Sequence, residues 1–275
     1  MKKMKMLSVF MLTFMICQSP FAQPFLKTYT DPSNPNASVS FECITEKIDS
    51  QDNFYIGGHI GDTITLFKIN TLGTVLGTYK IKPSPANTRL DAIMIDNNGL
   101  VVVLGNIQGT SGGQGFIFQY DPGPGVVNWF SQTAAIDAIT YLDMSETNGR
   151  YYLVSGEVRT TGYYSGLIMQ INRNGGGTSP GTEFLAGGLE TPLAMQLSGS
   201  TIYTAGRYAL GGGSNGFRAS LSRFNSATFA HNGSNYYLTP APPVSGARTY
   251  SNDILIDGNR AVMVGNGDDN AATYA

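Results

Sequence analysis

The chain has 275 residues, and its 41% hydrophobic and 11% aromatic content excludes a disordered protein. Charged residues make up 13% of the chain without forming a basic patch, which argues against nucleic acid or an anionic membrane surface as a partner. The 34 glycines, and the lack of helical periodicity beyond the N-terminus, predict an all-β protein made of short strands and tight turns.

Residues 1–22 are predicted to be a secretory signal peptide. A basic start with Lys2, Lys3 and Lys5 precedes an apolar run, and Ala22 offers a small residue for cleavage. The run is too short for a membrane-spanning helix, and Ile16 is too bulky for a lipoprotein signal. We therefore expect a protein that is secreted or held at the cell surface, with no membrane insertion after cleavage.

Cleavage would change both the charge and the cysteine count. It leaves 14 basic against 19 acidic side chains, a net charge of −5. It also leaves Cys43 as the single cysteine, within the strand-like run SFECIT. We expect no intramolecular disulfide and a buried, inert thiol.

A repeat runs through the rest of the chain. Apolar runs end at an aligned glycine five times, with spacings of 47, 51, 50 and 59 residues, at Gly58, Gly105, Gly156, Gly206 and Gly265. A short strand and a turn rich in Asp, Asn, Ser or Gly precede each run, and such turns favour hairpins. A third strand and a more polar fourth strand follow in the earlier units.

Four antiparallel strands in each unit of about 50 residues predict a β-propeller. A β-sandwich is the main rival, but it does not explain why the four-strand unit and its turns recur. The expected blades cover residues 43–90, 91–140, 141–191 and 192–251, with a partial fifth at 252–275. The aligned glycine is predicted to mark a close approach of two backbones.

Both ends suggest a ring that these residues do not complete. Residues 23–42 contain the segment LKTY, which matches the fourth-strand segment LGTY, and they are expected to supply a ring-closing strand and a linker. The fifth unit stops after its second strand. We therefore expect the sequence to be part of a longer chain, with one to three further blades and a C-terminal sorting module.

The first unit resembles the propeller repeats of exported bacterial proteins, including the SBBP and delta-60 types. The shared letters are Asp49, Asn53, Tyr55 and Gly58, followed by Lys68, Ile69, Asn70 and Gly73. Asp52 stands where those repeats have glycine, and later blades keep fewer of the letters. The resemblance implies a propeller fold and export from Bacteroidota-like cells, and it implies no shared reaction.

Motifs for specific chemistry are weak. His59 and His231 have neither the spacing nor the partners of a zinc site, and we expect both to be solvated loop residues. The turn at Asp49–Asn53 favours a hairpin over a calcium loop, and 266–270 is the better calcium candidate, although an exposed loop is favoured there too. Ser214 lies in GGSNG but precedes a strand, which excludes a nucleophile elbow. No cofactor, metal or catalytic residue is predicted.

The residues that directly follow the aligned glycines are the best candidates for a site. If the blades are equivalent, the five residues form a polar ring at one mouth of the central channel: His59, Asn106, Glu157, Arg207 and Asn266. Ordinary polar residues at strand ends are the simpler interpretation.

The favoured function is a secreted, non-enzymatic module that binds an extracellular glycan or protein. A glycan hydrolase or lyase that uses carboxylates at the channel mouth is one alternative, and a structural spacer is another. The sequence indicates neither the ligand nor the oligomeric state.

Overall fold

A computed structural model describes residues 39–45, 49–60, 63–81, 88–107, 114–132, 139–147, 149–158, 164–175, 178–183, 190–209, 217–237 and 248–268. The predicted signal peptide, the ring-closing segment 25–29, Ser214 and residues 269–270 lie outside these ranges, as does the side chain of Cys43. None of the described residues forms a helix long and apolar enough to cross a membrane.

The described residues form antiparallel sheets that follow one another along the chain. Blade 1 contains β1 (Val39–Ile44), β2 (Asn53–Ile60), β3 (Thr63–Asn70) and β4 (Val75–Ile81). Blade 2 contains β5 (Thr88–Ile95), β6 (Val101–Ile107), β7 (Gln114–Asp121) and β8 (Val126–Gln132). Blade 3 contains β9 (Ile139–Thr147), β10 (Arg150–Val158), β11 (Tyr164–Asn172) and β12 (Thr178–Glu183). Blade 4 contains β13 (Glu190–Ser198), β14 (Thr201–Ala209), β15 (Phe217–Asn225) and β16 (His231–Tyr237).

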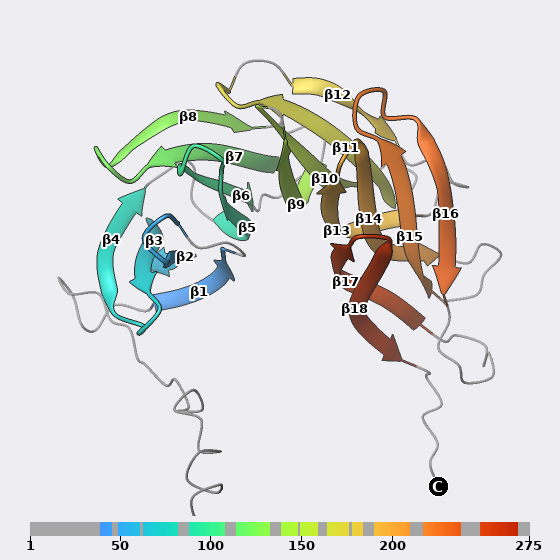
Figure 1. The fold of residues 1–275 in the computed structure, drawn as a ribbon, viewed down its shortest axis with the longest axis horizontal. Coiled ribbons are helices and arrows are strands. Elements are labelled where there is room, and N and C mark those ends of the chain that lie inside the picture. The colour runs from blue at the N-terminus through green and yellow to red at the C-terminus, as the bar shows by residue number, and fades with distance from the viewer. Residues whose placement is uncertain are drawn as a thin grey trace, which may run out of the picture.

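A fifth unit consists of the hairpin β17 (Arg248–Asp257) and β18 (Arg260–Asp268). One parallel residue pair, Phe217 with Arg248, joins β17 to β15 of blade 4. The units lie along an arc, with the first strands on its inner side and the fourth strands on its outer side (Figure 1). This is the arrangement of a β-propeller, and the predicted fold class is confirmed.

Burial follows the position of a strand in its blade. All seven residues of β6 are buried, whereas β8 is largely exposed at the rim. The same contrast separates β2 from β4 in blade 1. In blades 1 and 2 the second strands are the buried ones and are mainly apolar, as the sequence predicts for strands covered on both faces.

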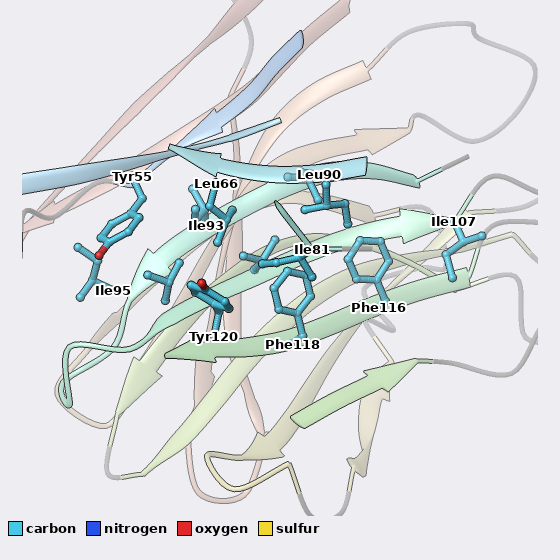
Figure 2. Packing of buried hydrophobic residues seen from close by; sticks show 13 residues of the cluster. Tyr55, Leu66, Ile81, Leu90, Ile93, Ile95, Ile107, Phe116, Phe118 and Tyr120 are labelled. Atoms are coloured by element: carbon cyan, nitrogen blue, oxygen red, sulfur yellow. The ribbon is translucent and has the colours of Figure 1, made fainter. Parts of the chain in front are cut away.

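The largest described core fills the space between blades 1 and 2. Tyr55 and Leu66 from blade 1 point toward Ile93, Phe118 and Tyr120 from blade 2 (Figure 2). Separate clusters join blade 2 to blade 3, blade 3 to blade 4, and blade 4 to the β17–β18 hairpin. Apolar packing between successive blades therefore holds the arc together.

The aligned glycines lie opposite a bulge in the first strand. The register shifts after Phe41, Leu90, Pro192 and Ser251, and these residues pair with Gly58, Gly105, Gly206 and Gly265 respectively. In blade 3 the shift falls one residue away from Gly156. A bulge pushes the backbone toward the facing strand, so that only glycine leaves enough room.

The described first strands begin two to four residues before the predicted blade starts. Examples are β5, which begins at Thr88 rather than at residue 91, and β13, which begins at Glu190 rather than at residue 192. These starts contain polar residues or proline, which conceal a strand in sequence although the backbone still pairs with β6 or β14.

Candidate functional site

Two of the five proposed ring residues are buried, and one of them, His59, lies in the joint between blades 1 and 2. His59 is only 9% exposed, with Nδ1 3.0 Å from Oε1 of Glu42 and Nε2 2.9 Å from Oγ1 of Thr88. Asn106 is 8% exposed and donates from Nδ2 to Asp91. The prediction that His59 is a solvated loop residue is therefore wrong, because this residue lies inside β2 and bridges two blades.

The other ring residues occupy equivalent places in their strands. Glu157 pairs with Ile139, Arg207 with Thr191, and Asn266 with Tyr250. Arg207 is partly buried, Asn266 is exposed, and the side chain of Glu157 lies outside the described part of the structure. The alignment of the five positions holds, while their role as a ligand-binding ring stays a prediction.

Glu42 takes part in a set of hydrogen bonds that join the first strands of neighbouring blades. Its Oε2 accepts a hydrogen bond of 2.6 Å from the amide of Leu90 in the next blade. Oδ2 of Asp143 accepts one of 2.7 Å from the amide of Met195. Gln196 likewise accepts from the amide of Ile256. These polar side chains hold the inner strands in place, which favours a structural role for the channel-side network.

A cavity of about 600 Å³ lies between blades 1 and 2, at the edge that carries the β1–β2 and β5–β6 turns. We call it the first cavity. This edge is opposite to the one that carries the predicted ring. Its walls include Gln51, Lys68 and Tyr79 from blade 1, and Asn97 and Asn98 from blade 2. The volume is that of a small-molecule site.

The turn around Asp49 forms one wall of the first cavity. Oδ1 of Asp49 accepts hydrogen bonds from the amides of Gln51 at 2.8 Å and Asn53 at 2.9 Å. Oδ2 lies 2.9 Å from Nζ of Lys68. Both carboxylate oxygens are thus used to fix the hairpin and to neutralise the lysine, as the predicted hairpin role requires.

Asp96 fixes the β5–β6 turn of blade 2 as Asp49 fixes the β1–β2 turn of blade 1. Its Oδ1 accepts from the amides of Asn98 at 2.8 Å and Leu100 at 2.9 Å. Its Oδ2 accepts from Oη of Tyr151 at 2.8 Å and from Nε2 of Gln119 at 3.0 Å. Asp96 therefore fixes the second wall of the cavity and also joins blade 2 to blade 3.

The remaining groups of the first cavity suit a neutral polar ligand. Tyr79 lies half-buried between Tyr55 and Tyr120, with ring-centre distances of 6.5 and 5.3 Å. The side chains of Asn97 and Asn98 are exposed and have no hydrogen-bond partner among the described residues. Because Lys68 is paired with Asp49, the cavity presents amides and an aromatic ring rather than a free cation.

A second cavity of about 490 Å³ lies between blades 2 and 3 on the same edge. Asn98 lines both cavities, so the β5–β6 turn is their shared wall. The far wall contains Asn172 from the end of β11, with Arg173 and Asn174 from the β11–β12 turn. Nε1 of Trp129 donates a hydrogen bond of 2.7 Å to the carbonyl oxygen of Arg173 and so holds that turn against blade 2.

No group of three or more histidine, cysteine, aspartate or glutamate side chains within the described ranges is arranged to hold a metal ion. The structure contains instead two polar cavities that the sequence does not predict. Their lining comes from turns of different blades, and the only signal in the sequence is the abundance of amides in those turns, as in DNNG and NRNG.

The contribution of Asp49 to the free energy of unfolding should depend on pH. Burial raises the pKa of Asp49, but the Asn53 amide, Lys68 and the Gln51 amide outweigh that effect and lower the pKa from 3.8 to about 2. The stabilisation is complete above pH 4 and is lost as the pH falls from about 4 to 2.

Asp49→Asn keeps an acceptor for the turn but loses the charge. We expect it to lower the free energy of unfolding by about 1 kcal/mol at pH 7, and to make little difference near pH 2. Urea unfolding at the two pH values measures this difference. Asp52→Asn, in the exposed part of the same turn, is the matched control and should have little effect at either pH. An Asp49→Asn effect that does not depend on pH would contradict the ion-pair explanation.

No protein-family model matches the chain, and no curated protein matches it in sequence. Solved structures do resemble the fold. A subtype N10 neuraminidase-like protein of A/little yellow-shouldered bat/Guatemala/060/2010 aligns with a TM-score of 0.50 at 10% identity, over 74% of this chain and 60% of that one. At this identity the likeness shows the propeller fold alone.

Two further solved structures align less well. A protein of unknown function from Bacteroides caccae has a TM-score of 0.48 at 12% identity, over 81% of this chain and 69% of that one. A gluconolactonase from Xanthomonas campestris has a TM-score of 0.46 at 12% identity, over 79% of this chain and 67% of that one.

Proposed function

We propose that the protein is an exported propeller module that binds a neutral extracellular glycan in the first cavity. The observation that carries the proposal is that one cavity holds a half-buried tyrosine ring, Tyr79, together with the side-chain amides of Asn97 and Asn98, which have no hydrogen-bond partner among the described residues. A sugar offers an apolar ring face for the tyrosine and hydroxyl groups that both donate to and accept from carboxamides. Binding to a protein partner is the competing outcome.

The rigidity of the walls supports this proposal. Asp49 and Asp96 fix the two turns through backbone amides, so the backbone that carries the amide side chains is already in place before a ligand arrives. A preorganised site loses less conformational entropy on binding, which raises affinity without additional contacts.

The experiment is a screen of the purified chain on glycan and protein arrays, followed by calorimetry with any glycan that binds. Gln51→Ala combined with Asn98→Ala should weaken binding about tenfold, the equivalent of about 1.4 kcal/mol. Asn235→Ala, on the exposed rim strand β16, is the matched control and should bind like the natural chain. If binding survives the double substitution, the site lies elsewhere on the protein. If the chain binds nothing on either array, the structural spacer is the favoured function.

A glycan hydrolase or lyase is the second candidate. The observation in its favour is that Asp49 and Asp96 line the same cavity, since glycoside hydrolysis uses two carboxylates. The binding function is preferred because both oxygens of each carboxylate already accept hydrogen bonds or an ion pair. Incubating the bound glycan with the protein and measuring new chain ends decides between them. Cleavage that Asp49→Asn abolishes would establish the enzyme.

Export is the remaining part of the proposal. Its support is the basic and apolar N-terminus that ends near Ala22. Expression of the full chain in a bacterial host, followed by N-terminal sequencing of the exported material, should give a chain that begins at Gln23. A chain that stays inside the cell and still carries residues 1–22 would contradict export.

A further inference from the structure

We infer that the glycan is an extended chain of several sugar units that occupies both cavities at once. This inference rests on the proposed function and names the ligand class of the same site. The central observation is that the cavities of about 600 and 490 Å³ are neighbours on one edge and share Asn98 as a wall. A single small sugar would fill only one of the two adjoining cavities, because each is within the range of about 300–1,000 Å³ that is usual for one small ligand.

The wall between the cavities is fixed from the far side. Oε2 of Glu146 in blade 3 accepts a hydrogen bond of 2.8 Å from the amide of Asn97. The other oxygen of the same carboxylate pairs with Nη2 of Arg173, which lines the second cavity. One carboxylate therefore connects the shared turn to the far wall, so the two cavities keep a fixed spacing.

A second clamp acts on the far wall. The Trp129 indole donates a hydrogen bond to the backbone carbonyl oxygen of Arg173. It also lies so close to Gly175 that a Cβ added to this glycine would be 2.6 Å from the indole ring. Gly175 also has a positive φ of 76°, which favours glycine. The β11–β12 turn thus sits directly against blade 2, and its amide residues are held beside the shared wall.

The charge of the second cavity agrees with that of the first. Arg173 is paired with Glu146, just as Lys68 is paired with Asp49. Asn98, Asn172, Asn174 and Gln119 supply the other polar groups, all of them uncharged. Both cavities therefore offer neutralised cations and carboxamides, which suits a neutral polysaccharide with repeated hydroxyl patterns rather than an acidic one.

The extended-chain inference predicts that affinity depends on ligand length. A ligand that spans both cavities gains its second set of contacts within one complex, so its affinity should exceed that of a one-cavity fragment at least tenfold. The test is calorimetry of the natural chain with a series of oligosaccharides of increasing length, prepared from the glycan that the array identifies. Kd should fall with length and then reach a plateau once both cavities are filled.

Two variants separate the cavities. Asn174→Ala, in the second cavity, should leave the affinity for the shortest binding fragment unchanged and weaken the longest about tenfold. Gln51→Ala, in the first cavity, is the matched comparison and should weaken both. Thermal unfolding verifies that each variant is folded, and both positions lie in exposed turns.

The outcomes distinguish the two proposals. If short fragments bind in the first cavity but Kd does not change with length and Asn174→Ala has no effect, the extended-chain inference is overturned and the proposed function stands. If no fragment of any length binds, both fail. Length dependence that persists in Asn174→Ala would also overturn the inference, because the additional units would then contact another surface.

Discussion

Gly206→Ala is expected to lower the free energy of unfolding by about 3 kcal/mol, the upper end of what overpacking usually costs. A Cβ at this position would lie 2.1 Å from the carbonyl oxygen of Thr191 and 2.8 Å from Cα of Pro192. Both are backbone atoms of the bulged first strand β13, so no side-chain rotation relieves the clash. The bulge, the sheet register or the blade interface must move instead.

The matched control is Gly199→Ala in the β13–β14 turn of the same blade. Gly199 has a positive φ of 58° and no atom within 4 Å of the added Cβ, so its cost is conformational, about 1 kcal/mol. Urea unfolding of both variants gives the comparison. Gly105→Ala should behave like Gly206→Ala, because its Cβ would meet the Arg89 carbonyl oxygen at 2.3 Å. Equal costs for Gly206→Ala and Gly199→Ala would show that the bulge yields easily.

The fold could be predicted because its determinants are local and repeated. Turn residues such as Asp52 and Gly99 both have positive φ in the structure, and they stand at the same distance before the aligned glycines Gly58 and Gly105. A regular pattern of this kind fixes the hairpins, and the hairpins fix the number of strands in each blade. The starts of the first strands cannot be read from the sequence, because their pairing is set by the neighbouring strand and not by their own composition.

The candidate site could not be predicted because it depends on contacts between blades. The equivalent positions of His59 and Asn106 were correctly aligned, but the partners that bury His59 include Thr88, in a different blade. The first cavity likewise joins Gln51 to Asn98, whose turns are separate in sequence and adjacent in space. A repeat shows which positions are equivalent, whereas their environments are decided by what each blade presents to the next.

Glu190→Gln is expected to raise the free energy of unfolding by about 2 kcal/mol at pH 7. Glu190 is 1% exposed at the start of β13, and its Oε2 has no hydrogen-bond partner among the described residues. Its Oε1 accepts a hydrogen bond of 2.5 Å from Oγ of Ser222, which lies 2.6 Å from Oγ of Ser234. The exposed His231 completes this chain, with Nε2 2.8 Å from the same Oγ of Ser234.

Burial raises the pKa of Glu190 above its usual 4.5, although the hydroxyl groups and His231 act in the opposite direction. The folded state therefore binds a proton more tightly than the unfolded state does. Stability should be greatest below about pH 4.5 with respect to this group, and it should fall as the pH rises through the folded pKa. Arg218, which lies on β15 near Ser220 and whose Nε is buried without a partner, does not offset the penalty by an ion pair within the described residues.

Glutamine has the shape of the protonated acid and no charge to bury, so Glu190→Gln should remove the loss of stability at higher pH. At pH 4 the variant and the natural chain should unfold at similar urea concentrations, and their curves should separate as the pH is raised to 8. His231→Gln tests the other end of this hydrogen-bonded series. It removes the imidazole that opposes the rise of the Glu190 pKa, so it should deepen the penalty in the natural glutamate background only. A variant that is less stable than the natural chain at pH 8 would show that Glu190 is held ionised by a partner, and would reverse the sign of the pH dependence assigned to blade 4.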